Sequence, residues 1–448
     1  MYEMAQALPT KQFFIENITR DITLEDAILD LVDNCVDSIV RVYGIDVSVN
    51  LLSPDLVVPD SLNINDRSLV AIEISKEKFK ISDKCGGIDK NHAKENVFRF
   101  GRTNTAVKST LGVYGIGMKR AVFKIGRFIE IESHTTENGF RVIIDVEKWA
   151  SNDTSWDLPM EILEPASSLE ESGTEITITN LTCESKLRIN DGTFMKRLSK
   201  FISNTYSLFL DKFISIELNN KRIKPDFLPI GSSSDILPGY KVIETDSVSV
   251  NLFAGLASRI DNEWTSERAG WYVLCNGRVV VSADKTELTG WGRHGPTFQP
   301  KHRGFVGIAF FFSKDPASLP WTTTKRGLNQ ESPVYQIARK EMALLSRPVL
   351  NFINNMYPSD IVEEIPEREL AEQLKPIKVT EIIDKSSKSF KSPDTKQTRE
   401  RRKFISIQYK AERVDVERIK KKINQPGWGA GKVGRFTFDY YMRMELKE

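Results

Sequence analysis

The chain has 448 residues, of which 40% are hydrophobic and 28% charged, a composition typical of a globular protein with two or three domains. No apolar run approaches the ~20 residues that cross a bilayer, and the first residues lack the order of a signal peptide. Four scattered cysteines without a CxxC pair, and four histidines without metal-ligand spacing, favour a cytoplasmic protein with neither membrane contact nor a zinc site.

The net charge of +2 conceals an asymmetry. Residues 385–448 carry 18 Lys or Arg against 8 Asp or Glu, whereas residues 1–384 carry 45 against 53. A mildly acidic body is therefore followed by a basic C-terminal extension.

Residues 23–43 predict a helix, because apolar residues recur at helical spacing and Thr23 can cap the first turn. Asp30, Asn34 and Asp37 are spaced i, i+4 and i+7, so they lie on one face. That face is either solvated surface or a functional site. An Asn amide oxygen is a hard ligand that suits Mg²⁺, and a carboxylate one turn earlier can orient and deprotonate a water molecule.

A turn after a predicted hairpin supplies another acidic group. Residues 44–68 are expected to form a loop, and residues 68–83 alternate as a hairpin that ends at Asp83. Gly86 and Gly87 follow directly. A carboxylate in such a turn can accept a hydrogen bond from an adenine amino group, while the glycines let the base approach the backbone. The alternative is an ordinary surface turn, for which Asp and Gly are common choices.

A second glycine-rich turn carries three glycines and a lysine, namely Gly112, Gly115, Gly117 and Lys119. It leads into a predicted helix over residues 118–125, and N–H groups at such a helix start favour phosphate. A dinucleotide-binding fold would need a strand directly before the glycines. Residues 98–110 are instead polar, and we expect the stretch 99–118 to be a flexible lid.

The rest of the chain completes three predicted parts. Strands over 127–147 and 174–180 complete a two-layer α/β sandwich in a first domain of residues 1–190. Residues 191–357 predict an α+β domain with helices at 194–210 and 332–356 and strands at 213–223, 248–256, 270–275, 278–282 and 305–312. Residues 358–448 predict a linker, a charged helix over about 398–424 and a basic aromatic tail.

Together these segments resemble the GHKL ATPases, which include gyrase B, the ninety-kilodalton heat-shock chaperone, histidine kinases and MutL. The glycine loop GVYGIGMKRA is similar to that of the MORC group and its prokaryotic relatives. The resemblance implies a Bergerat-type fold that binds ATP and Mg²⁺, with Asp30 as general base and Asn34 as the Mg²⁺ ligand. The nucleotide-binding positions that it implies are Asn34, Asp37, Asp83, Gly87, Gly112, Gly115, Gly117, Lys119 and Thr174. SGTEITITNL resembles a further family motif, which implies that Thr174 lies beside Asp83 near the adenine.

Two positions depart from the family pattern. The family base is normally Glu, and Asp30 is about one methylene shorter. Since general-base help contributes ~10²–10⁴-fold, we expect slow hydrolysis. Cys85 stands where the family has its first glycine, with Gly86 one place later, which would shift the turn.

The resemblance extends to about residue 350. VLCNGRVVV is similar to the Asn-Gly-Arg segment of the S5-like transducer domain in gyrase B and MutL. WTTTKRGLN places Lys325 where the transducer has a catalytic, phosphate-sensing lysine, with Arg326 as its immediate rival. The alternative is that both are solvated loop cations.

The interpretation is an ATPase that acts as a conformational switch, closing as a homodimeric clamp through its N-terminal domains with residues 1–20 as an exchanged arm. The basic region 385–448 suits DNA, or else is a solvated helix with an aromatic patch for a protein partner. The alternative function is a chaperone-like or scaffold module in which ATP gates protein binding without significant hydrolysis. A histidine kinase would need a phospho-accepting His before the motif helix, and the roughly 20 residues there contain none. Neither a gyrase-type cleavage domain nor a MutL-type nuclease motif is expected after residue 358.

Overall fold

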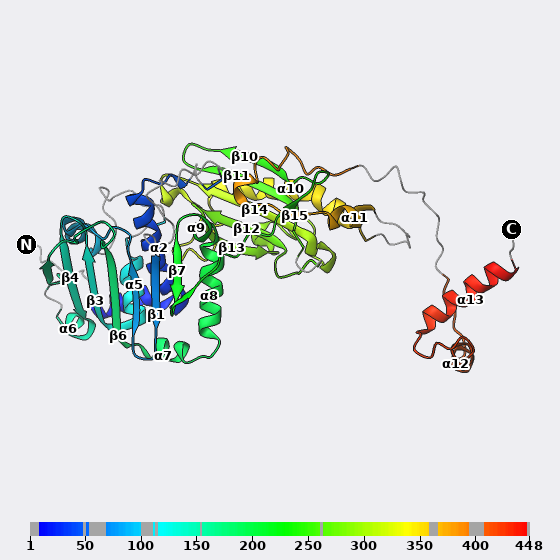
Figure 1. Cartoon of the computed structure of the whole chain (residues 1–448), viewed down its shortest axis with the longest axis horizontal. Helices are drawn as coiled ribbons and strands as arrows, with labels where there is room; N and C mark the ends of the chain where they lie inside the picture. Colours follow the sequence, from blue (N-terminus) through cyan, green and yellow to red (C-terminus); the bar gives the residue numbers. More distant parts are fainter. Residues whose placement is uncertain are drawn as a thin grey trace, which may run out of the picture. The chain divides into compact units, whose positions relative to one another are not determined.

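A computed structural model describes residues 9–47, 51–52, 69–99, 111–112, 115–152, 155–259, 263–357, 366–393 and 407–445. The chain divides into two compact units, the first with residues 1–358 and 363–395 and the second with residues 359–362 and 396–448 (Figure 1). Most of the predicted loop 44–68, the centre of the predicted lid and the start of the arm 1–20 lie outside the described residues. Within the described ranges, no helix is long and apolar enough to cross a membrane.

The first unit begins with a mixed sheet of eight strands in the order β5-β4-β3-β6-β2-β1-β7-β8. The pairing of β1 with β7 is parallel and the other pairings are antiparallel. The strands are β1 Leu69–Ile74, β2 Phe79–Asp83, β3 Gly126–His134, β4 Gly139–Asp145, β5 Met160–Leu163, β6 Gly173–Leu181, β7 Ser215–Leu218 and β8 Lys221–Arg222. Alternate residues are buried, as Val70 and Ile72 are in β1, so a helical layer covers one face of this sheet (Figure 1).

Helix α2 (Leu24–Val42) is the central element of that layer and packs against α5 (Gly117–Ile125). Its start is fixed by a capping box, in which Thr23 and Asp26 satisfy each other's backbone N–H groups. The predicted helix, the hairpin of β1 and β2, and the helix after the glycine turn are thereby confirmed. The remaining helices of this part are α1 Lys11–Arg20, α4 Lys90–His92, η1 Ala93–Val97, α6 Val146–Ser151, α7 Cys183–Ile189, α8 Phe194–Thr205 and α9 Ser207–Lys212.

A second sheet follows, with five strands in the order β10-β11-β14-β12-β13. These are β10 Gly239–Glu244, β11 Ser249–Leu256, β12 Gly270–Cys275, β13 Arg278–Asp284 and β14 Phe305–Phe312. Every residue of the central strand β14 is buried, and the long helix α10 (Pro333–Asn355) packs on β11 and β14. The short helices are η2 Glu287–Thr289, η3 Pro300–Gly304 and η4 Pro316–Ser318. The mixed α+β class is confirmed.

Two boundaries differ from the sequence-based expectation. The strand expected over 213–223 is the pair β7 and β8, which extends the first sheet beyond residue 190 because Leu69–Ile72 of β1 pairs with Ser215–Leu218. Residues 366–393, expected as linker, belong to the first unit: α11 (Pro366–Glu372) is followed by β15 (Lys375–Pro376), paired with β9 (Gly231–Ser232), and η5 (Val379–Glu381). This segment was expected to be a linker because its apolar residues are few and irregularly spaced among charged ones. Several of these apolar residues are nevertheless buried, namely Ala371, Leu374, Ile377, Ile382 and Phe390.

The second unit is described over residues 407–445 and holds two packed helices, α12 (Arg413–Lys422) and α13 (Ala430–Glu445). The charged helix expected over 398–424 begins later than expected within the described residues, since residues 407–412 are not helical and α12 begins at Arg413. The aromatic tail is helical despite its glycines. Trp428 stacks edge-on against Phe436, and Val433 is buried.

Candidate functional site

Asp83 lies at the end of β2 with both carboxylate oxygens engaged. Its Oδ1 accepts a 2.9 Å hydrogen bond from the Cys85 backbone N–H, and the Cys35 thiol of α2 lies 3.3 Å from Oδ2. Burial raises the pKa of Asp83, and these hydrogen bonds partly oppose that rise. The register of β2 and β6 pairs Asp83 with Thr174, whose hydroxyl lies 2.9 Å from that of Ser133. The two residues expected near adenine are thus neighbours across two strands.

The turn after Asp83 needs its glycines. Gly86 and Gly87 have φ angles of +82° and +70°, the left-handed region that side chains disfavour. A Cβ on Gly87 would lie 2.1 Å from the His134 carbonyl oxygen, and one on Gly173 would lie 1.9 Å from the Asp83 carbonyl oxygen. Gly173 was not among the predicted site residues, although it directly precedes Thr174. The backbone therefore passes too closely here for any side chain.

The three polar residues that were predicted on one face of α2, Asp30, Asn34 and Asp37, lie in three different environments. Asn34 is exposed although its neighbours Asp33 and Cys35 are buried. Asp37 accepts hydrogen bonds from the Leu111 and Gly112 N–H groups at 2.7 and 2.8 Å, so it fixes the start of the glycine turn. Asp30 is buried in an ion pair with Arg120 of α5. The expected shared face thus contains an exposed amide, a loop anchor and a buried pair.

The glycine turn leads into α5, whose first residue, Gly117, lies against Asp30 of α2. Gly115 has a φ of +65°, and a Cβ on Gly117 would lie 3.7 Å from Asp30 Cγ. Lys119 Nζ donates to the carbonyl groups of Val97 and Arg99 at 2.7 and 2.5 Å, and burial lowers the pKa of Lys119 to about 8. Lys119 therefore holds the segment that precedes residues 100–110, which lie outside the described residues together with residues 113–114.

Asp33 is a site residue that the sequence analysis did not select. Arg278 Nε lies 2.9 Å from its Oδ1 and Lys325 Nζ lies 2.6 Å from its Oδ2, with all three side chains buried. Burial alone would raise the pKa of Asp33, but Arg278 and Lys325 lower it to about 2. The signal in the sequence was an acidic residue inside an apolar helical run, which requires a buried partner.

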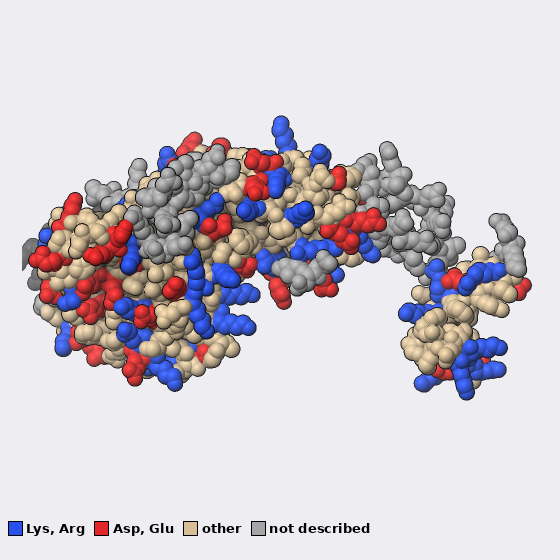
Figure 2. All heavy atoms as spheres, viewed as in Figure 1, with Lys and Arg blue, Asp and Glu red and all other residues tan. Residues whose placement is uncertain are grey.

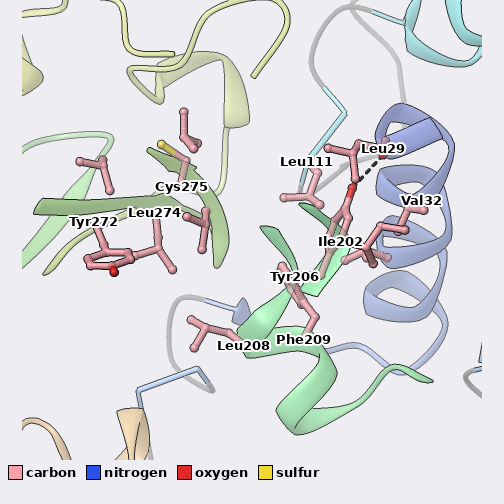
Figure 3. Packing of buried hydrophobic residues seen from close by; sticks show 14 of the residues in the cluster. Leu29, Val32, Leu111, Ile202, Tyr206, Leu208, Phe209, Tyr272, Leu274 and Cys275 are labelled. Carbon is pink, nitrogen blue, oxygen red and sulfur yellow. Dashed lines mark hydrogen bonds between the residues drawn. The ribbon is translucent and has the colours of Figure 1, made fainter. Parts of the chain in front are cut away.

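Tyr206, between α8 and α9, is a further member of this network. Its hydroxyl lies 2.7 Å from Asp33 Oδ1 and 2.8 Å from the Leu29 carbonyl oxygen, the contact drawn in Figure 3. Arg278 Nη1 also donates to the Lys325 carbonyl oxygen at 2.7 Å. Lys325 itself has a φ of +54°, a strained conformation that the network holds in place.

The loop that carries Lys325 touches the first domain at two more points. Arg326, the rival of Lys325 in the sequence analysis, pairs instead with Asp26 in the first turn of α2. Arg120 Nη2 donates to the Thr323 carbonyl oxygen at 3.1 Å. Neither Lys325 nor Arg326 is merely solvated. The loop contacts α2 directly at Asp26 and Asp33, and Arg120 connects it to Asp30.

Residues 22–175, from before Asp30 to just past Thr174, match the family model described as histidine kinase-, DNA gyrase B- and HSP90-like ATPase. This match supports a GHKL-type ATPase domain over residues 22–175. A GHKL domain indicates ATP binding, and the fold and superfamily expected from the sequence are confirmed to that extent. A search of curated proteins finds no match to the chain. The nearer resemblance to MORC and MutL proteins stays a prediction.

The residues present fit ATP and Mg²⁺. Asn34 offers an exposed amide oxygen between the buried residues Asp33 and Cys35, and such an oxygen is a hard donor that suits Mg²⁺ beside phosphates. Asp83 offers a carboxylate at the end of β2, directly before the turn of Gly86 and Gly87, which carry no side chains. The start of α5, where Gly117 lies against Asp30, offers backbone N–H groups to a phosphate.

Proposed function

We propose that the chain is an ATPase that works as a conformational switch, with slow, Mg²⁺-dependent hydrolysis. The observation that carries this proposal is the Asp33 network, in which Lys325 and Arg278 of the second domain contact the helix that bears Asp30 and Asn34. A ligand at that helix would change the contacts of the second domain directly. Such differential contact is what a ligand needs in order to shift a conformational equilibrium.

Each site residue has a proposed role. Asp83 would accept a hydrogen bond from the adenine amino group with Thr174 beside it, and Gly87 would give the base its approach. The glycine turn, with Lys119 behind it, would hold the phosphates. Asn34 would hold Mg²⁺, which supplies charge neutralisation at the phosphates when bound. Asp30 would orient and deprotonate the attacking water.

The second domain would act as an S5-like transducer. Lys325 now pairs with Asp33, and a γ-phosphate offers it a second anionic partner. Exchange of one partner for the other would move the loop that also carries Thr323 and Arg326. Closure of two such chains as a dimer would follow from that movement, with the N-terminal arm as the exchanged segment.

The test is phosphate release from ATP and Mg²⁺ by the wild type, Asp30→Ala and Lys325→Ala, together with sizing with and without nucleotide. We expect slow release that Asp30→Ala abolishes, and ATP-dependent dimers that Lys325→Ala no longer forms. Lys314→Ala, an exposed lysine in the same domain, is the control and should behave as wild type. Equal rates in wild type and Asp30→Ala would refute the proposed base.

One observation favours the alternative function, a module in which ATP gates protein binding without significant hydrolysis. Both Asp30 oxygens accept hydrogen bonds from the Arg120 guanidinium in a buried pair, and this contact competes with a water for the same carboxylate. Tight ATP binding without turnover, under conditions where ATP still changes the oligomeric state, would favour this second reading.

DNA is the proposed partner of the second unit. Exposed cations gather around α12, as Figure 2 shows, and exposed aromatic side chains on α13 would suit base stacking.

The test measures DNA binding as a function of salt concentration, for wild type and for a variant in which Arg418, Lys421 and Lys422 are each replaced by Gln. The slope of log affinity against log salt should fall by ~0.9 for each phosphate that the variant no longer neutralises. The control variant replaces three exposed lysines of the first unit, Lys76, Lys196 and Lys221, by Gln, and its slope should equal that of wild type. An unchanged slope in the α12 variant would favour a protein partner instead.

A further inference from the structure

Arg120 makes a two-point contact with the carboxylate that is proposed as the base. Its Nε lies 2.6 Å from Asp30 Oδ2 and its Nη2 lies 3.0 Å from Asp30 Oδ1. The side chains are 7% and 3% exposed, so water has little access to the pair. A bidentate pair in this environment holds the orientation of both groups.

The same guanidinium reaches the second domain. Arg120 Nη2 donates to the Thr323 carbonyl oxygen, in a loop closed by a bridge between Trp321 and Leu328. Within that loop, the Lys325 N–H donates to the Thr322 carbonyl oxygen at 2.9 Å. The proposed base and the proposed phosphate sensor are therefore joined through one short, hydrogen-bonded loop.

We infer that Arg120 is a positioning residue that restrains ATP hydrolysis by occupying Asp30 until the loop carrying Thr323 and Lys325 moves. The inference rests on the proposed function, because it concerns the same base. A shift of the loop would remove the Thr323 acceptor and let one arm of Arg120 leave Asp30. The attacking water could then give its proton to the freed carboxylate oxygen while its own oxygen bonds to the γ-phosphorus and the bond to ADP breaks.

A purely structural role is the alternative, since buried ion pairs are common and removal of one partner is costly. The two roles differ in what a lysine at position 120 does. Lysine keeps the positive charge but cannot bond both Asp30 oxygens and Thr323 with one planar fork. A structural role predicts a less stable protein with the same or lower turnover. The restraining role predicts higher turnover and a looser loop.

The experiment compares wild type, Arg120→Lys and Lys124→Gln, alone and in an Asp30→Asn background. Lys124 is the matched control, because it is a buried cation one turn further along α5, paired with Glu184 and not with Asp30. Steady-state phosphate release gives kcat and KM for ATP. Hydrogen exchange of residues 321–328 without nucleotide gives a readout that does not depend on turnover.

For Arg120→Lys we expect kcat to rise by up to ~10-fold with KM unchanged, a part of the ~10²–10⁴-fold that general-base help supplies. Exchange in the loop should accelerate. Lys124→Gln should change neither quantity, and Arg120→Lys should change nothing further in kcat when Asp30 is already Asn. A kcat in Arg120→Lys that is unchanged or lower, an unchanged loop, or an equal effect in the Asp30→Asn background would overturn the inference.

The same measurements distinguish failure of the proposed ATPase function from failure of the restraint by Arg120. If the wild type releases no phosphate but Arg120→Lys does, the restraint stands and the claim of slow wild-type turnover fails. If Asp30→Asn turns over as fast as wild type, the proposed base fails. If neither wild type nor Arg120→Lys turns over ATP, both the restraint and the hydrolysis are refuted.

Discussion

Asp33 gives the sharpest test of the link between the two domains. Its carboxylate is the anionic partner of two buried cations, Arg278 and Lys325, whose side chains are 2% and 8% exposed. Asp33→Asn keeps the size of the side chain but removes its charge. The two cations would then remain close to each other in a region with little water.

The expected cost follows from the burial of these groups. Removal of one partner from a buried ion pair costs ~3–5 kcal/mol, because the remaining charge is then uncompensated. Hydrogen bonds that the Asn oxygen accepts, and the bond that the Tyr206 hydroxyl donates to the Leu29 carbonyl oxygen, recover a part of this cost. We therefore expect Asp33→Asn to lower the free energy of unfolding of the first unit by roughly 3 kcal/mol.

The control is Glu184→Gln, which removes the carboxylate of another ion pair. Lys124 lies 2.7 Å from Glu184, but that carboxylate is 51% exposed, so the loss should be at most ~1 kcal/mol. Urea unfolding followed by tryptophan fluorescence measures both variants. Losses for the two variants that agree within ~0.5 kcal/mol would refute the claim that Asp33 compensates two buried charges.

Three further predictions concern the same domain. Gly87→Ala should abolish ATP binding measured by calorimetry, because its Cβ would lie 2.1 Å from a backbone oxygen, whereas Gly192→Ala has open space and should bind as wild type. Equal affinities would contradict the close approach. The pKa of Asp33 is lowered from 3.8 to about 2, so the stability that it contributes is complete above the unfolded value and is lost as pH falls through about 2. The unfolding free energy of wild type, relative to Asp33→Asn, should therefore fall by ~2 kcal/mol over that window, and a constant difference would contradict it. Asp37→Asn should accelerate hydrogen exchange at Leu111 and Gly112, whose N–H groups Asp37 now binds, and unchanged exchange would show that this anchor is unimportant.

Local patterns made much of the first domain predictable. The capping box at Thr23, the apolar spacing of α2 and the alternation of β1 and β2 are all properties of short segments. Asp83 could be chosen because a carboxylate and two glycines follow a strand directly. That Thr174 lies opposite Asp83 came from the family resemblance, and the register of β2 and β6 agrees with that position.

The partners of the buried charges could not be predicted in this way. Arg278 and Lys325 lie 245 and 292 residues after Asp33, so no local pattern connects them. Arg120 lies 90 residues after Asp30 and reads in the sequence as one more cation beside Lys119. Helix α13 was missed because its glycines suggested turns, whereas packing of Trp428 on Phe436 favours the helix.

The most direct test of the central claim, an ATP site around Asp83, is equilibrium binding of ATP with Mg²⁺ measured by calorimetry. Loss of a hydrogen bond to a charged group costs ~1.5–3 kcal/mol, so Asp83→Asn should bind ATP roughly 10- to 100-fold more weakly than wild type. Asp89→Asn, an exposed acid six positions along the same turn, should bind as wild type. Equal affinity in wild type and Asp83→Asn, or no binding by the wild type, would contradict the account.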